Sequence, residues 1–440
     1  MIIYAHTLTT RLRYIADFIG NEINGNPFFQ LTSDVDLYRR SAQPKINYSD
    51  EVIVPDELLI TPHLLLFEEG IKHQSVDCFE LSGYKAFFRS KGGYPFDIFA
   101  ASFYLLTRYE EYLPHRKDEY GRYAHENSIA YREGFLHLPL INMWIRDFKR
   151  ALQDTFPLLH DEFRNANGNQ RFSFLPTYDI DEAWSYKHKS FRKTAGGIAR
   201  TFFKGEWQQI NERIRVLTGK QEDPYDAYQW MDQLHQRFNL HPRYFFIMAD
   251  KNSGYDKNIL PDKKAMGELI KRLTSKYAVG LHPSWQSGGD ISLISKEKEK
   301  LEQLSGGKIL SSRQHYIRLT LPGTYRLLIE AGIENDFSMG YGSINGFRAS
   351  VTSAFFWYDL EKEIATRLRL YPFCFMDANS FYEQRLTPQE ACEEMTRYAG
   401  IIRTVNGTMI SIWHNSFLGS SPIYRGWKEA YEKFISGISS

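Results

Sequence analysis

Two carboxylates, Asp179 and Asp181, stand two residues apart just after the apolar run 172–176. On an extended backbone, residues i and i+2 point to the same side, so both side chains should face the same space. The C-terminal end of a barrel strand opens into loops, where charge can reach water or a metal ion. Taken alone, the pair favours a surface β-turn, in which Asp is common. The residues that follow along the chain favour a chemical site.

Further ionisable side chains close other strand-like apolar runs: His282, Arg313, His315, Asp336, Asp377 and His414. One histidine at a strand end is more often structural than catalytic. Repeated Asp, His and Arg at one end of one sheet is harder to explain by packing, because burying so many ionisable groups is costly unless they pair or bind metal. Aspartate with histidine suits a borderline divalent ion such as zinc.

Positioning these side chains together requires a parallel sheet. Strand-like segments alternate with helical patterns through the second part of the chain, which favours a β/α barrel. The predicted strands are 171–175, 244–248, 277–281, 309–313, 333–337, 373–377 and 409–414. We therefore predict an α/β protein with a distorted seven-stranded (β/α) barrel at its C-terminal side.

A polar stretch rich in Asn and Gly, 164–170, separates a helical pattern from the first of these strands. Such a stretch is typical of a linker. Before it, short β-like runs precede helical patterns around 96–112 and 140–152, without an evident acid–base constellation. The expected division is an N-terminal α+β domain of unknown role, 1–165, and the barrel, 171–440.

Composition excludes several classes of protein. The 440 residues include 54 basic and 53 acidic ones, so the net charge of +1 gives no reason to expect nucleic acid. Three scattered cysteines form neither a disulfide framework nor a zinc-cluster spacing. Neither a signal-peptide pattern at the N-terminus nor an apolar run long enough for a membrane span occurs. We expect a cytoplasmic protein.

From about residue 171 onward, the chain resembles the polysaccharide deacetylases of carbohydrate esterase family 4, which carry the NodB-homology barrel. Thr177-Tyr178-Asp179-Ile180-Asp181 is similar to the family's first motif, and Arg313 with Tyr316 to its third. Ile412-Trp413-His414 approximates the fifth motif. Over its whole length the chain also resembles two-domain Bacteroidetes proteins that contain this domain.

The resemblance implies removal of N-acetyl groups from an amino sugar. By motif, Asp179 would be the general base, Asp181 and His282 metal ligands, and His414 the general acid, with zinc as the expected metal. The second motif, His-Ser/Thr-x-x-His, is incomplete because Gln286 stands where the family has its second histidine. An amide is a poor zinc ligand, so His315 or Gln286 is expected to complete the shell.

Other residues were assigned by position. Arg313 is expected to fix Asp179, since a guanidinium can pair a carboxylate with two parallel bonds. An aromatic floor for a sugar ring is expected, although core or rim packing explains its residues equally well. The substrate-binding candidates are Trp285, Tyr316, Asp336, Arg348, Asp377 and Trp413.

Two alternatives remain open at this stage. One is a degenerate barrel that binds glycan without cleaving it, which the Gln286 departure favours. The other is a related C–N amidase of the allantoinase kind. The basic segment 185–220 would suit peripheral contact with an anionic membrane or a lipid-linked carrier, although a solvated insertion explains it better.

Overall fold

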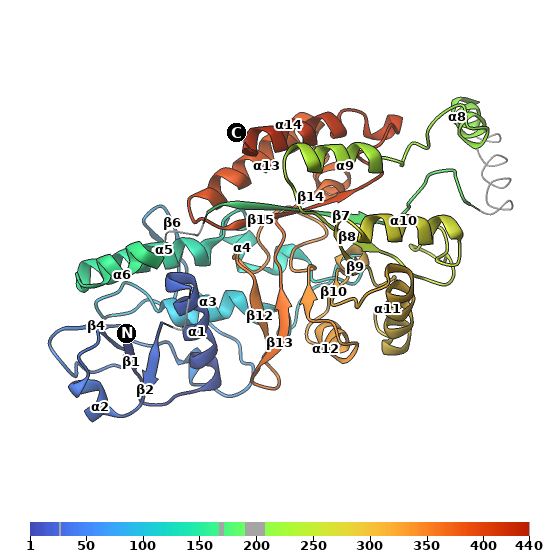
Figure 1. Ribbon diagram of the computed structural model, residues 1–440. Coiled ribbons are helices and arrows are strands. Elements are labelled where there is room, and N and C mark those ends of the chain that lie inside the picture. The colour runs from blue at the N-terminus through green and yellow to red at the C-terminus, as the bar shows by residue number, and fades with distance from the viewer. Residues whose placement is uncertain (26–27, 167–170, 190–206, 440) are drawn as a thin grey trace.

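The computed structural model describes residues 1–25, 28–166, 171–189 and 207–439 (Figure 1). Its largest sheet has the strand order β12-β13-β11-β10-β9-β8-β7-β15-β14. All neighbours from β13 to β14 pair in parallel, and only β12 is antiparallel to its partner. The strands are β7 (Ser173–Ile180), β8 (Arg243–Phe246), β9 (Ala278–Leu281), β10 (Ser311–Ser312), β11 (Asn335–Asp336), β12 (Phe355–Asp359), β13 (Ile364–Leu370), β14 (Phe375–Met376) and β15 (Thr408–His414).

Each of the seven predicted strand segments overlaps a strand of this sheet, and these strands occupy adjoining positions from β11 to β14. The protein is thus a mixed α/β fold with a large, mostly parallel sheet. Among the described residues, no pairing joins β14 to the other end of the sheet. Closure into a seven-stranded barrel therefore stays a prediction.

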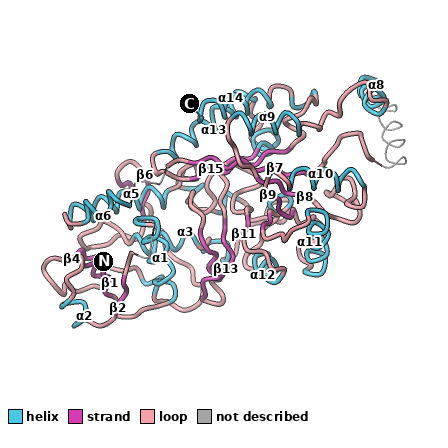
Figure 2. The backbone as a smooth tube through the Cα atoms, viewed as in Figure 1, coloured by secondary structure: helices cyan, strands magenta, loops and turns pink. Residues whose placement is uncertain are grey.

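Helices cover the outside of this sheet, and the strands lie toward the middle of the molecule (Figure 2). Figure 1 shows α9, α13 and α14 together over β7 and β15. Helix α13 begins at a capping box formed by Thr387 and Glu390, and buries Ala391, Met395 and Ile402 at helical spacing. The helices are α8 (Trp207–Leu217), α9 (Tyr228–Arg237), α10 (Lys264–Thr274), α11 (Ile291–Ser305), α12 (Gly323–Glu330), α13 (Pro388–Arg403) and α14 (Trp427–Ser439).

The N-terminal region forms a second, smaller sheet of parallel strands in the order β2-β1-β3-β4, with a separate β5–β6 hairpin. Its strands are β1 (Ile2–Tyr4), β2 (Gln30–Thr32), β3 (Lys45–Asn47), β4 (Glu57–Leu59), β5 (Phe79–Leu81) and β6 (Tyr84–Ala86). Its helices are α1 (Thr10–Asn24), α2 (Val35–Arg40), α3 (Ile98–Leu106), α4 (Ile129–Arg132), α5 (Leu140–Thr155) and α6 (Leu159–Ala166).

The β12–β13 hairpin contacts both regions of the chain, the N-terminal region (1–166) and the second region (171–439). The sequence analysis did not predict this hairpin. Tyr14 on α1 donates to the carbonyl of Phe356 at 2.7 Å, and Arg11 is bonded to Glu363. The apolar core of the N-terminal region continues without interruption into Tyr325 and Trp357 of the second region. Aromatic side chains of α1, more than 300 positions away, therefore pack on Phe355 and Tyr358 of the hairpin, which local patterns cannot reveal.

Candidate active site

The carboxyl ends of β7, β9, β10 and β15 meet around one cavity of about 470 Å³. Strand β7 brings Asp179 and Asp181, and β15 pairs with it so that His414 lies opposite Asp179. His282 follows β9 directly, and His315 lies in the turn after β10. All five side chains line the cavity. Parallel strands place their carboxyl ends at the same edge, which is why residues so far apart in sequence converge.

A trio of side chains at the centre has the composition of a metal site. One ligand atom from each of Asp181, His282 and His315 lies within 4.8 Å of the others. His282 Nε2 is 3.2 Å from Asp181 Oδ1, and His315 Nε2 is 3.5 Å from Asp181 Oδ2. Two imidazole nitrogens and one carboxylate oxygen are the ligand set of many catalytic zinc sites.

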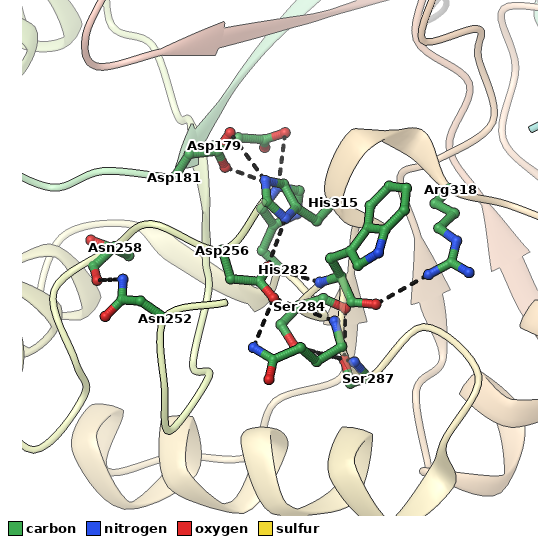
Figure 3. Close-up of polar contacts among 12 residues, drawn as sticks. Asp179, Asp181, Asn252, Asp256, Asn258, His282, Ser284, Ser287, His315 and Arg318 are labelled. Atoms are coloured by element: carbon green, nitrogen blue, oxygen red, sulfur yellow. Dashed lines mark hydrogen bonds and ion pairs between the residues drawn. The ribbon is translucent and has the colours of Figure 1, made fainter. Parts of the chain in front are cut away.

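A hydrogen bond behind each ring directs its outer nitrogen to this point. Figure 3 shows the bond between His315 and Asp256. His282 Nδ1 is 2.5 Å from the carbonyl oxygen of Arg313, and His315 Nδ1 is 3.1 Å from Asp256 Oδ1. Both partners accept hydrogen bonds, so each Nδ1 carries a proton, and each ring, when neutral, offers an Nε2 lone pair toward Asp181. Lone pairs would then face a carboxylate, and a cation between them removes the repulsion. The residues fit a divalent metal.

His414 approaches the same carboxylate from the other strand. Its Nε2 is 3.5 Å from Asp181 Oδ2, and its Nδ1 donates to Asp377 Oδ1 at 2.7 Å. Burial lowers the pKa of His414, but the charges and hydrogen bonds of Asp377 and Asp181 outweigh it, so this pKa is raised well above the ordinary histidine value. Burial also lowers the pKa of His315, but the charges and hydrogen bonds of Asp181 and Asp256 outweigh this effect and raise that pKa to about 9. In the absence of metal, protonation supplies positive charge around Asp181.

Asp179 occupies a buried position beside the trio. Arg313 Nη1 donates to Asp179 Oδ1 at 2.8 Å and to Thr177 Oγ1 at 2.7 Å, while its Nε donates to the carbonyl of Phe337. The expected two parallel bonds do not form: a single nitrogen contacts the carboxylate, and Arg313 Nη2 has no partner among the described residues. The other Asp179 oxygen lies 3.7 Å from His282 Nε2 and faces the cavity.

Asp256 is a supporting residue that the sequence analysis missed. It lies in the loop between β8 and α10, is buried, and accepts from the backbone N–H of Trp285 at 2.8 Å as well as holding His315. Gln286, considered as a metal ligand, donates its amide to Asp256 Oδ2 at 3.0 Å and to the carbonyl of Lys251. The structure thus places Gln286 behind the trio, where its amide helps to hold the carboxylate that orients His315.

The Asp256 contact can be tested by metal affinity. We expect Asp256→Asn to weaken zinc binding about 10–100-fold, because an amide orients the His315 ring less strongly than a carboxylate does. Isothermal titration of the metal-free protein with zinc measures the change. Glu297→Gln is the matched control, since Glu297 is also buried and bonds Ser284 in the same loop region but contacts none of the trio. An Asp256→Asn affinity equal to that of the control would contradict the assignment.

The substrate-binding candidates separate into two groups. Tyr316 lines the cavity, and Trp285 contacts it edge to face with ring centroids 5.6 Å apart. The remaining candidates are buried and do not line it: Asp336, Arg348, Asp377 and Trp413. Trp413 packs on Tyr431 in the core at a centroid distance of 4.4 Å. It neighbours His414 on one strand, so the two side chains necessarily point to opposite faces.

The two buried carboxylates among these candidates, Asp336 and Asp377, accept hydrogen bonds from other residues of the protein. Asp336 accepts from Ser312 and Ser338, and burial raises its pKa to about 6 despite these bonds. Asp377 holds His414 through both the ring and the backbone N–H. In the structure, Asp377 therefore supports the cavity residue His414, and Asp336 joins the ends of β10 and β11 through Ser312.

Arg348 also has a different place from the one expected. Its guanidinium is buried and donates to both oxygens of Glu111, at 2.8 and 2.5 Å, and to the carbonyl of Gly340 at 3.0 Å. Burial raises the pKa of Glu111, but Arg348 and Arg108 outweigh it and bring this pKa down to about 2. Through these contacts Arg348 joins Glu111 of the N-terminal region to the second region.

We expect Arg348→Met to lower the free energy of unfolding by about 3–5 kcal/mol, because it leaves the Glu111 charge buried with only Arg108. Urea denaturation followed by circular dichroism measures this. Arg237→Met is the control, because the Arg237–Glu432 pair is largely exposed and such pairs contribute at most about 1 kcal/mol. Equal losses in the two variants would contradict a buried, stability-determining pair.

The cavity wall includes residues that motif analysis did not single out. Tyr120 and Arg122 come from the N-terminal region, Tyr255 comes from a loop, and Tyr382 and Tyr424 come from short helical turns. The signal that could have found the tyrosines is the high aromatic content, 15% of the chain, although composition does not give positions. The basic segment 185–220 falls largely outside the described residues, since 190–206 are not described. Among the described helices, each is too short or too polar to cross a lipid bilayer.

Comparisons with known proteins give one family match and several structural matches. Residues 1–157 match the model of a family of unknown function, DUF7033. No curated protein sequence matches the chain. Among solved structures, a Mycobacterium smegmatis protein assigned as a polysaccharide deacetylase has 14% identity and a TM-score of 0.39, covering 62% of this chain and 86% of its own.

Two further structures are similar at the same level. The Puue allantoinase has 11% identity and a TM-score of 0.37, covering 62% of this chain and 85% of its own. A polysaccharide deacetylase from Bacillus cereus has 11% identity and a TM-score of 0.29, covering 61% of this chain and 88% of its own. At these identities and scores, a functional proposal must rest on the residues of the cavity.

Proposed function

We propose that this protein is a metal-dependent hydrolase that removes N-acetyl groups from an amino sugar of a polysaccharide or glycan precursor. The observation that carries the proposal is the trio of Asp181, His282 and His315, with Asp179 and His414 beside it in one cavity. Zinc held by the trio would polarise the acetyl carbonyl and lower the pKa of the attacking water.

The chain's own residues then perform the proton transfers. Asp179 accepts the proton of the attacking water at the oxygen that Arg313 leaves free, while Arg313 keeps the carboxylate in one orientation. His414 donates its Nε2 proton to the departing amine, because the raised pKa keeps this ring protonated near neutral pH. Asp377 holds the imidazole in the matching orientation through Nδ1. The acid and the base thus have separate environments, as the reaction requires.

The cavity also suits the carbohydrate part of the substrate. Its wall combines tyrosine rings with the polar groups of Asn415 and Ser416, so that apolar ring faces and hydroxyl groups can both be met. The Gln286 departure, which favoured the non-catalytic alternative, has less weight because the His315 nitrogen faces Asp181 in its place.

Acetate release tests the proposal. The zinc-loaded protein is incubated with N-acetylated chito-oligosaccharides and with lipid-linked N-acetyl sugars, and acetate is measured in an enzyme-coupled assay. We expect release by the wild-type protein and none by metal-free protein. Stoichiometric zinc binding without acetate release from any of these amino sugars would contradict the proposal. Glycan binding without hydrolysis would favour the binding-module alternative, and cleavage of allantoin would favour the amidase.

A further inference from the structure

One turn of the N-terminal region reaches the cavity in the second region. We call it the 117–123 turn: Lys117 and Tyr123 form its antiparallel bridge, and Asp118 Oδ1 accepts from the backbone N–H of both Tyr120 and Arg122. Gly121 completes it with a left-handed φ of 75°. These local bonds give the turn its own shape. Tyr120 and Arg122, held in this way, form part of the cavity wall.

Arg122 attaches the turn to the backbone next to the metal trio. Its Nη1 donates to the carbonyl of Tyr316 at 2.8 Å and to that of Gly342 at 3.0 Å, and its Nε donates to Asp118 Oδ2 at 2.6 Å. The contact with Gly342 is so close that a Cβ there would lie 2.0 Å from Arg122 Nη1. The buried Arg122 guanidinium therefore joins two segments of the second region, at Tyr316 and at Gly342.

The Tyr316 carbonyl belongs to a strained segment. Tyr316 and Ile317 follow His315 directly and have left-handed φ values of 59° and 52°. Non-glycine residues keep such conformations only where surrounding contacts enforce them, and these conformations cluster at functional sites. Arg122 supplies one of these contacts from outside the second region. The position of the His315 ring consequently depends on the N-terminal region.

Tyr120 adds a ring to an aromatic cluster on the same side. The centroid of the Tyr120 ring lies 5.2 Å from that of Tyr316, 5.9 Å from that of Tyr255 and 6.4 Å from that of Trp285. The Arg122 guanidinium lies over the Tyr120 ring, 4.7 Å from its centroid. Tyr120 is only half-buried, and no described hydrogen bond uses its hydroxyl group. Such a surface matches the apolar face of a pyranose ring.

We propose that the 117–123 turn makes the N-terminal region a working part of the active site. Arg122 is a positioning residue that fixes the backbone following His315, and Tyr120 contacts a second sugar ring, adjoining the one that reacts. The Arg122 step requires only that the trio binds metal. The Tyr120 step rests on the proposed function, because it assumes an amino-sugar substrate of at least two rings.

Metal titration tests the Arg122 step without relying on turnover. We expect Arg122→Lys to weaken zinc affinity about 10-fold, as changes behind a ligand do. Arg11→Lys is the matched control, because Arg11 also bridges the two regions through Glu363 but does not line the cavity. Both are titrated calorimetrically below their unfolding temperatures. Gly342→Ala, which displaces Arg122 from the opposite side, should repeat the loss if Arg122→Lys does not fold. Unchanged zinc affinity in the folded variants overturns this step.

Substrate kinetics test the Tyr120 step. With N,N′-diacetylchitobiose, Tyr120→Ala should raise KM about 3- to 10-fold with kcat nearly unchanged, whereas Tyr120→Phe, which keeps the ring, should resemble wild type. With the monosaccharide N-acetylglucosamine, Tyr120→Ala should have no such effect. If the protein hydrolyses neither sugar, direct binding of diacetylchitobiose is compared instead, and the same ratio of dissociation constants supports the contact. Equal KM or binding in Tyr120→Ala and wild type overturns it.

Discussion

Asp179→Asn should reduce acetate release by about 10²–10⁴-fold while zinc still binds. The amide keeps the size of the carboxylate and can still accept the hydrogen bond from Arg313, but it cannot take a proton from water. Asp179 lies outside the metal trio, so the zinc affinity should change much less than the rate. The loss should therefore fall on kcat, with KM nearly constant.

The measurement is kcat for acetate release at saturating zinc, together with calorimetric zinc affinity for the same preparation. Asp232→Asn serves as the control, because Asp232 is also a buried aspartate but pairs with Lys276 and Tyr277 away from the cavity. If Asp179→Asn releases acetate at the wild-type rate, Asp179 is not the base. A parallel loss of zinc affinity would instead make Asp179 a metal ligand.

The convergence of the cavity residues could be predicted from the sequence because it depends only on where each residue lies in its strand and on the strands being parallel. Once Asp181, His282 and His414 are each placed at the end of a strand, and the strands are parallel, one edge of the sheet must collect them. His315 was considered for the same reason, since it follows the neighbouring strand. No knowledge of distant contacts enters this inference, and the structure brings these residues into one cavity.

The residues that the sequence did not reveal are held by distant contacts. Asp256 lies within a long loop, where strand or helix periodicity gives no position. Arg122 and Tyr316 are separated by 194 positions, and Arg348 and Glu111 by 237. An isolated arginine in a sequence is equally compatible with an anionic substrate and with a buried partner. The same limit applies to β12 and β13, whose packing partners lie in the N-terminal region.

Trp413 is a different case, because the sequence did contain the information that places it in the core. Trp413 and His414 were assigned to the same strand, and adjacent residues of a strand point to opposite faces. A strand with His414 directed to the cavity must direct Trp413 into the helix-covered layer, where Tyr431 on α14 contacts it. The alternation of side chains along a strand thus decides whether an aromatic residue next to a candidate acid faces the cavity or the core.

Removal of one trio member should abolish tight metal binding, whereas removal of His414 should not. We expect Asp181→Ala, His282→Ala and His315→Ala each to weaken zinc affinity by more than about 100-fold. Substitution of a residue that only orients a metal ligand has a smaller effect. Two of the three protein ligands of a catalytic zinc site then remain. His414→Ala should retain zinc, because Asp377 holds its ring from behind and its role is to donate a proton.

Thermal unfolding distinguishes these variants without an activity assay. Zinc at 100 times its dissociation constant stabilises a folded protein by about 2.7 kcal/mol, so the wild-type protein and His414→Ala should unfold at higher temperature when zinc is added. The three trio variants should show almost no shift at the same zinc concentration. A zinc-dependent shift retained in His315→Ala but lost in His414→Ala would place the third ligand on β15. His414 would then no longer be available as the acid, and the amine proton would have to come from another residue of the cavity.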